Sequence, residues 1–375
     1  MRNDHTREWS MLLALIAIWA FFALKEPVFL SARNLSLLSI ELAVTATLAL
    51  GMLLVLLPGQ IDLSAGSGVG LTGAVAAVLV FWHGAPAPVA LLVALVAAVI
   101  IWSLMGALVV IERVPAFIIT LGGLLVFRGL HWLVIHNQTV PIVAGSDSNI
   151  YSQLTTWFLP AQAGYLLAAV VVATIVIISL RQRRSRQQLG LPVGDAEQWF
   201  MSLFISGQVV LLLVTVANGY RGVPMALVIL AAIALLVHVV TIHTPFGRYL
   251  YAIGGNEDAA VVSGVPVRAV VIGAFALMGA IVALTGFMQT AYSGASTTTV
   301  GSLMELDAVA ACVIGGTSLR GGRGTVIGVL FGAVMMTSLL NGMTLMAVSP
   351  EIKYIARGGV LALAVWLDLR ISGQR

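Results

Sequence analysis

Twelve apolar runs dominate this chain, and most are close to the roughly 20 residues that a helix needs to cross a bilayer. They cover residues 9–24, 36–57, 64–82, 89–111, 115–136, 164–180, 199–217, 224–242, 269–290, 304–316, 325–346 and 352–369. Only 9% of the residues are charged, whereas a soluble domain carries about 25%. We therefore predict an all-α polytopic membrane protein, a single transmembrane domain over residues 1–375 with about 10–12 transmembrane or re-entrant helices.

The first run resembles a signal peptide, because a polar start precedes an apolar stretch. No A-x-A cleavage site follows, and Lys25, Glu26 and Pro27 come next. We expect an uncleaved first span.

Basic residues indicate the orientation of the spans. With a cytoplasmic N-terminus, the inner segments hold thirteen lysines and arginines, and the outer loops hold only Lys25, Arg33 and Arg221. This asymmetry follows the positive-inside rule. We expect both termini in the cytoplasm of a multi-pass inner-membrane protein. The basic linker 181–198 also lies inside, where it serves orientation and contact with anionic membrane lipids.

A polar segment, Pro245 to Pro266, lies between two apolar runs on the same inner side. Asn256 is a good helix N-cap, and Glu257 and Asp258 follow in the first turn. Gly264 and Pro266 then end the helix. A helix of about two turns is too short to be stable alone, so we expect this segment to dock on a partner.

Several motifs are absent. There is no G-x-x-x-x-G-K-[ST], no H-E-x-x-H, no C-x-x-C and no G-x-S-x-G, and the six histidines are dispersed. We therefore expect no catalytic site, no metal site and no ATP binding by a P-loop. Gly68-x-Gly70-x-x-Gly73 lies within an apolar run, which favours close helix packing over dinucleotide binding. The arginines are scattered between spans, so nucleic acid is not an expected partner.

Four acidic residues lie near or inside spans: Glu41, Asp62, Glu305 and Asp307. Ionisable groups at this depth usually face a bundle interior or a water-filled path. Asp62, and Glu305 with Asp307, each precede the start of a helix, where a carboxylate can either cap free N–H groups or bind a ligand. The two helices enter from opposite sides, which suggests an inverted repeat around a central site.

Two segments, around 58–66 and 304–324, are expected to be re-entrant, because Pro, Gly and polar residues interrupt the apolar pattern. Arg128 lies within a span. It either pairs with one of the acids or extends to a membrane surface.

Four blocks of the sequence resemble a known family. They are PGQIDLSAGSGVGLTG, VPAFIITLGGLLVFRGL, GRYLYAIGGNEDAAVVSGV and ELDAVAACVIGGTSLRGGRGTVIGVLFGA, and the ending NGM…VSP…GGVLALAVWLDL agrees. They are similar to bacterial sugar ABC-transporter permeases of the ribose and xylose type, in family order from about Ser31 to Asp368. The insertion RQRRSRQQLGL with the next two spans resembles the xylose transport system permeases in particular. Gln60 departs from the small or acidic residue that relatives often carry there.

The resemblance implies a permease that forms a homodimer, works with cytoplasmic ABC ATPase subunits and a periplasmic sugar-binding protein, and imports a monosaccharide. ATP is then bound by the partner, and the chain itself needs no cofactor. The loop 243–268 looks like the cytoplasmic coupling element. Its candidate ATPase-coupling residues are Gly247, Arg248, Gly254, Gly255, Asn256, Glu257, Asp258, Ser263 and Gly264.

A neutral sugar needs hydrogen-bonding groups along its path rather than a fixed charge. The candidates for the translocation pathway are Asp62, Ser64, Thr120, Arg128, Glu305, Asp307 and Asn341. The alternative is an ion-coupled secondary sugar transporter, in which Asp62 or Asp307 carries a proton or sodium ion; it leaves the capped helix unexplained. No motif supports an enzyme or a passive channel.

Overall fold

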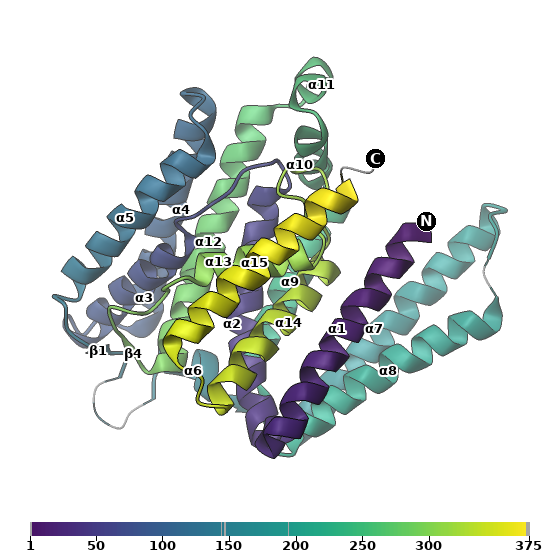
Figure 1. Cartoon of the computed structure of the whole chain (residues 1–375), viewed down its shortest axis with the longest axis horizontal. Helices are drawn as coiled ribbons and strands as arrows, with labels where there is room; N and C mark the ends of the chain where they lie inside the picture. The colour runs from purple at the N-terminus through teal and green to yellow at the C-terminus, as the bar shows by residue number, and fades with distance from the viewer. Residues whose placement is uncertain (1, 144, 146–147, 194, 373–375) are drawn as a thin grey trace.

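A computed structural model describes residues 2–143, 145, 148–193 and 195–372. Within these residues it contains fifteen α-helices, one 3₁₀ helix and four two-residue strands, arranged as a helical bundle (Figure 1). The helices are α1 Arg2–Lys25, α2 Ala32–Leu56, α3 Ala65–Phe81, α4 Ala87–Ile111, α5 Ala116–Val134, α6 Ile150–Thr156, α7 Ala161–Gln188, α8 Ala196–Asn218, α9 Met225–His243, α10 Pro245–Gly255, α11 Glu257–Val262, α12 Val267–Ser293, α13 Met304–Ile314, α14 Val326–Leu345 and α15 Pro350–Ser372, with the 3₁₀ helix η1 at Pro27–Leu30. The strands are β1 Val140–Pro141, β2 Phe158–Leu159, β3 Val223–Pro224 and β4 Ala295–Ser296.

The predicted fold class is confirmed, because each of the twelve apolar runs forms a helix. In the described part of the chain, eight helices are long and apolar enough to cross a membrane. The run at 304–316 forms only the 11-residue helix α13. An irregular stretch separates α13 from α14. This short helix fits the re-entrant segment expected there, since 11 residues reach only about half of a bilayer core.

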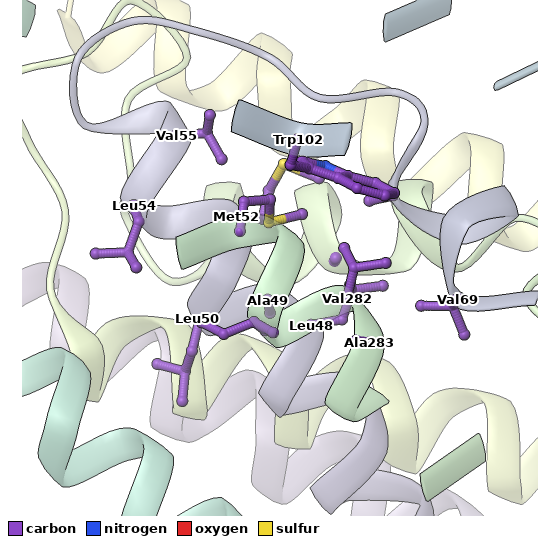
Figure 2. Packing of buried hydrophobic residues seen from close by; sticks show 14 of the residues in the cluster. Leu48, Ala49, Leu50, Met52, Leu54, Val55, Val69, Trp102, Val282 and Ala283 are labelled. Carbon is purple, nitrogen blue, oxygen red and sulfur yellow. The ribbon is translucent and has the colours of Figure 1, made fainter. Parts of the chain in front are cut away.

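Two long helices, α2 and α12, form the centre of the bundle. In their apolar windows 78% and 67% of the residues are buried. They approach closely because Gly51 has no side chain: a Cβ there would lie 2.8 Å from Met278 and Ile281 of α12. Figure 2 shows Leu48, Met52 and Val282 packed together in this core, with the indole of Trp102 from α4 beside them. Tight contact through small residues is the usual basis of helix association in membranes.

Two short antiparallel strand pairs tie loops together at one end of the bundle. β1 pairs with β4, with Val140 opposite Ser296, and β2 pairs with β3, with Leu159 opposite Val223. The α10 and α11 helices lie at the other end, together with the start of α1 and the end of α15 (Figure 1). The two ends of the molecule therefore carry different structures, one for each side of a membrane.

The α7–α8 hairpin stands apart from the bundle (Figure 1). Only 11% and 6% of the residues in its two apolar windows are buried. α7 continues through Gln188, so the first eight residues of the basic linker 181–198 are helical and the connection itself is short.

Candidate functional site

The α10–α11 segment, residues 245–264, contains the helix that the sequence predicted. Asn256 is the N-cap of α11, and its side chain accepts a hydrogen bond from the backbone N–H of Ala259 at 2.9 Å. Glu257 and Asp258 occupy the first turn, and Gly264 follows the helix with φ of +81°. This is the left-handed conformation that favours glycine.

A second helix, α10, precedes α11 and was not predicted. Thr244 caps it by accepting a hydrogen bond from the N–H of Gly247 at 3.2 Å, and Pro245 occupies its first turn. Both are ordinary start signals of a helix, so the sequence did contain the information. α10 lies directly against the bundle, with Leu250 and Ile253 buried.

The exposed part of this segment combines acidic and apolar side chains. Of the nine predicted coupling residues, Arg248, Gly255, Asn256, Glu257, Asp258, Ser263 and Gly264 are exposed. Val261 and Val262 are also exposed, at 56% and 89%. The sequence reasoning missed these valines, although two adjacent apolar residues in a polar segment were visible. An exposed apolar tip flanked by charges is typical of a contact surface.

The other two predicted coupling residues, Gly247 and Gly254, pack inward. A Cβ at Gly254 would lie 2.9 Å from the carbonyl carbon of Gly321, and still closer to Leu57 O and Gly322 N. All of these are backbone atoms, so the helix and the two loops touch backbone to backbone. The N–H of Gly322 also donates to Leu57 O at 2.9 Å. Gly254 therefore contacts both the end of α2 and the loop that follows α13.

Tyr251 adds a polar contact between α10 and the loop that follows α13. Its hydroxyl donates to the carbonyl oxygen of Gly324 at 2.7 Å. Partial burial raises the pKa of Tyr251 above its ordinary value, so the phenol keeps the proton that it donates. α10 is thus held to the loop after α13 by a hydrogen bond as well as by close packing.

α3 and α13 begin beside each other, and we call this meeting point the junction. A Cβ at Gly66 would lie 2.6 Å from Gly301 O and 3.0 Å from Glu305 N, and closer to a carboxylate oxygen of Glu305. From the junction, α3 leads toward β1 and β4, and α13 leads toward the loop beside α10. Both N-terminal ends, which carry partial positive charge, therefore face one point in the bundle.

Asp62 at the junction is enclosed by donors. Its exposed fraction is 0%, and it accepts hydrogen bonds from the backbone N–H of Ser64 at 2.8 Å and from the Ser64 hydroxyl at 2.6 Å. Trp102 Nε1 donates to the other carboxylate oxygen at 2.7 Å. Thr120 is buried nearby and donates to Ile61 O at 3.1 Å. These contacts favour a capping role for Asp62, because its oxygens already have partners.

A cleft of about 150 Å³ opens beside the junction. Its polar lining comes from α3 (Ser67), α5 (Arg128 and His131), the loop before α13 (Thr298 and Ser302) and α13 itself (Glu305). Arg128 is exposed and lies over the ring of Trp132, 5.7 Å from its centroid. Hydroxyl, imidazole, guanidinium and carboxylate groups around one cleft can donate to and accept from several ligand hydroxyls. Of the predicted pathway residues, the cleft brings Arg128 and Glu305 together.

Asp307 and Asn341 take part in contacts away from the cleft lining. Asp307 Oδ1 lies 3.2 Å from Arg357 Nε, which joins α13 to α15. Asn341 donates to Glu41 at 3.2 Å and accepts from Asn34 at 3.0 Å. The hydroxyl of Tyr292 donates to the second oxygen of Glu41 at 2.9 Å. This network links α2, α12 and α14 inside the bundle, and long-range pairing of this kind had no signal in the sequence.

No group of three or more His, Cys, Asp or Glu side chains that could hold a metal ion occurs in the described residues. Cys312 is buried, and its thiol donates to Ala49 O at 3.2 Å. This thiol therefore has a packing role within the core.

The sequence matches known transport permeases over nearly its whole length. A family model described as "Branched-chain amino acid transport system / permease component" matches residues 34–365. The chain is 40% identical to the xylose transport system permease protein XylH of Haemophilus influenzae over 371 residues, which cover 98% of this chain and 97% of that protein. It is also 40% identical to XylH of Escherichia coli K12, with 98% and 93% covered, and 33% identical to the ribose import permease protein RbsC of the same strain, with 98% and 96% covered. No solved structure matches.

Proposed function

The chain belongs to the family of branched-chain amino acid transport system permease components, and from this membership we propose that it is the permease subunit of an ATP-driven importer of D-xylose. The near full-length identity of 40% to xylose transport permeases carries this proposal. The protein is a multi-pass inner-membrane transport permease rather than an enzyme. ATP binding and hydrolysis would reside in a cytoplasmic ABC ATPase.

The α10–α11 segment is the proposed contact for that ATPase. Val262 and the acids Glu257 and Asp258 are exposed on α11, where they can enter a groove of the partner. Gly254 on the adjoining α10 touches the chain at Leu57 and Gly322. Leu57 lies at the end of α2, just before the break that precedes α3, and Gly322 lies in the loop that follows α13. Movement of α10 by the ATPase would therefore reach both helices of the junction and the cleft beside it.

The cleft is the proposed contact for the sugar. A pentose is neutral and rich in hydroxyl groups, so it suits a lining of short polar side chains with Arg128 and Glu305. Arg128 is exposed on α5, a helix long and apolar enough to cross a membrane, and a guanidinium that faced lipid there would be costly. A second copy of the chain covering this face would remove that cost, which supports a homodimer with the pathway between its two copies.

The orientation belongs to the same proposal: both termini and α11 in the cytoplasm, with a periplasmic sugar-binding protein at the opposite end. Val262→Cys tests it directly. Val262 is 89% exposed, while the native Cys312 is buried and should give little background. When the chain is expressed without its ATPase, a membrane-impermeant maleimide should label V262C in inside-out vesicles and leave it unlabelled in right-side-out vesicles. Labelling only in right-side-out vesicles would contradict the orientation.

Purification of the intact membrane complex tests the function and the substrate together. The tagged chain should co-purify with an ATPase and a periplasmic binding protein, and that binding protein should bind D-xylose more tightly than D-ribose. A binding protein that prefers ribose would overturn the xylose assignment and leave the importer intact. A chain that purifies without any ATPase would oppose the importer itself.

A further inference from the structure

The α7–α8 hairpin carries a cluster of basic side chains that the proposed function does not use. The last three turns of α7 hold four arginines, Arg181, Arg183, Arg184 and Arg186. None of the four forms an ion pair with another residue that the structure describes. Asp195 and Glu197 are the acidic residues of the segment 181–198, so four positive charges stand against two negative ones. The cluster therefore keeps unbalanced positive charge.

Trp199 indicates where the arginine cluster lies relative to the lipid headgroups. Trp199 at the start of α8 donates from Nε1 to the Ser179 hydroxyl on α7 at 2.7 Å. The Arg183 guanidinium lies over the Trp199 ring, 5.0 Å from its centroid. Tryptophan is enriched at the membrane–water interface, where its ring lies at headgroup level. The Trp199–Arg183 pair thus places the arginines where lipid phosphates lie.

The arginine end of the α7–α8 hairpin is separated from the rest of the bundle (Figure 1). Near its other end the hairpin packs through Ala168, Val214 and Ala217 against Val223 and Leu159 of the β2–β3 pair. At the arginine end it diverges from the bundle (Figure 1). Large apolar side chains such as Ile178, Phe200 and Phe204 are exposed below the arginines. Positive charge above an exposed apolar surface matches a molecule with an anionic head and hydrocarbon chains.

We propose that the arginine end of the hairpin, formed by Arg181, Arg183, Arg184, Arg186 and Trp199, is a binding site for an anionic phospholipid. The guanidinium groups bind its phosphate, since their planar forks match phosphate oxygens. The acyl chains lie along the exposed faces of α7 and α8, beside the bundle. The site rests on the cytoplasmic orientation in the proposed function, because positive-inside segments meet the anionic leaflet.

Native mass spectrometry of the purified full chain tests this site. Dioleoyl phosphatidylglycerol should be retained in preference to dioleoyl phosphatidylcholine. Each arginine near an anionic surface contributes about fivefold in affinity, so R181Q/R184Q should weaken phosphatidylglycerol binding by roughly 20-fold. The matched control, R113Q/R268Q, removes two exposed arginines from the same end of the molecule and should change binding little. Equal loss in both variants would overturn the site, because it would reduce the effect to overall charge.

Two further arms complete the test. R183Q/R186Q, which also removes the stacked guanidinium, should lose phosphatidylglycerol to a similar or greater extent, and unchanged binding would count against the site. Excess inorganic phosphate should leave the lipid bound, whereas displacement by phosphate would overturn the lipid assignment. No ATPase or sugar is needed, so failure of this inference is distinguishable from failure of the proposed import function.

Discussion

Replacement of Gly254 by alanine should disturb the seat of α10 on the bundle. The new Cβ would lie 2.9 Å from the carbonyl carbon of Gly321, 0.5 Å inside an ordinary contact of 3.4 Å, and it would overlap more strongly with Leu57 O and Gly322 N. Backbone atoms cannot rotate away as a side chain can, so the helix or both loops must move by more than half an ångström. Overpacking of this kind costs about 1–3 kcal/mol.

Gly255 offers a matched control one residue further on. A Cβ there meets nothing within 4 Å, so G255A should be neutral or slightly stabilising. In detergent, the apparent melting temperature of G254A should fall by about 1–4 °C, because a chain of 375 residues shifts by about 1.3 °C per kcal/mol. Sugar-stimulated ATP hydrolysis of the reconstituted complex should fall as well, because α10 no longer sits correctly. Identical melting of G254A and G255A would refute the close backbone contact, and full sugar-stimulated hydrolysis by G254A would refute its role in coupling.

The remaining predictions concern the junction and the α11 surface. Trp102→Phe removes the donor to Asp62 and should cost about 1.5–3 kcal/mol, measured as a lower melting temperature, because the acceptor stays buried. Trp132→Phe, which breaks an exposed hydrogen bond, should cost much less; equal shifts would show that the Asp62 contact has no special weight. Replacing Glu257 and Asp258 by lysine should abolish sugar-stimulated hydrolysis and uptake while the protein stays inserted in the membrane, with only a small loss of melting temperature from positive charge at the start of α11. Full transport by this variant would exclude a contact role for both acids.

The sequence predicted the local structure better than the long-range contacts. The caps of α11 depend on neighbouring residues such as Asn256 and Gly264, so their positions follow from ordinary helix signals. The short α13 was also predictable, because polar residues interrupt its apolar run. Whether the two halves of the chain form an inverted repeat stays a prediction.

Other contacts depend on helix packing that no local pattern encodes. The bond from Trp102 to Asp62 joins residues 40 positions apart, and that from Asn341 to Glu41 spans 300. Gly254 looked like one glycine among several in a polar segment, yet its lack of a side chain decides how α10 meets the bundle. The two carboxylates expected to share one role also differ, since Asp62 is enclosed whereas Glu305 lines the cleft.

Uptake of radiolabelled D-xylose into proteoliposomes tests the central claim most directly. We expect accumulation only when this chain, its ATPase, the sugar-loaded binding protein and hydrolysable ATP are all present, and no accumulation with a non-hydrolysable analogue. Uptake by this chain alone, driven by a proton or sodium gradient, would contradict it and would favour the ion-coupled transporter instead.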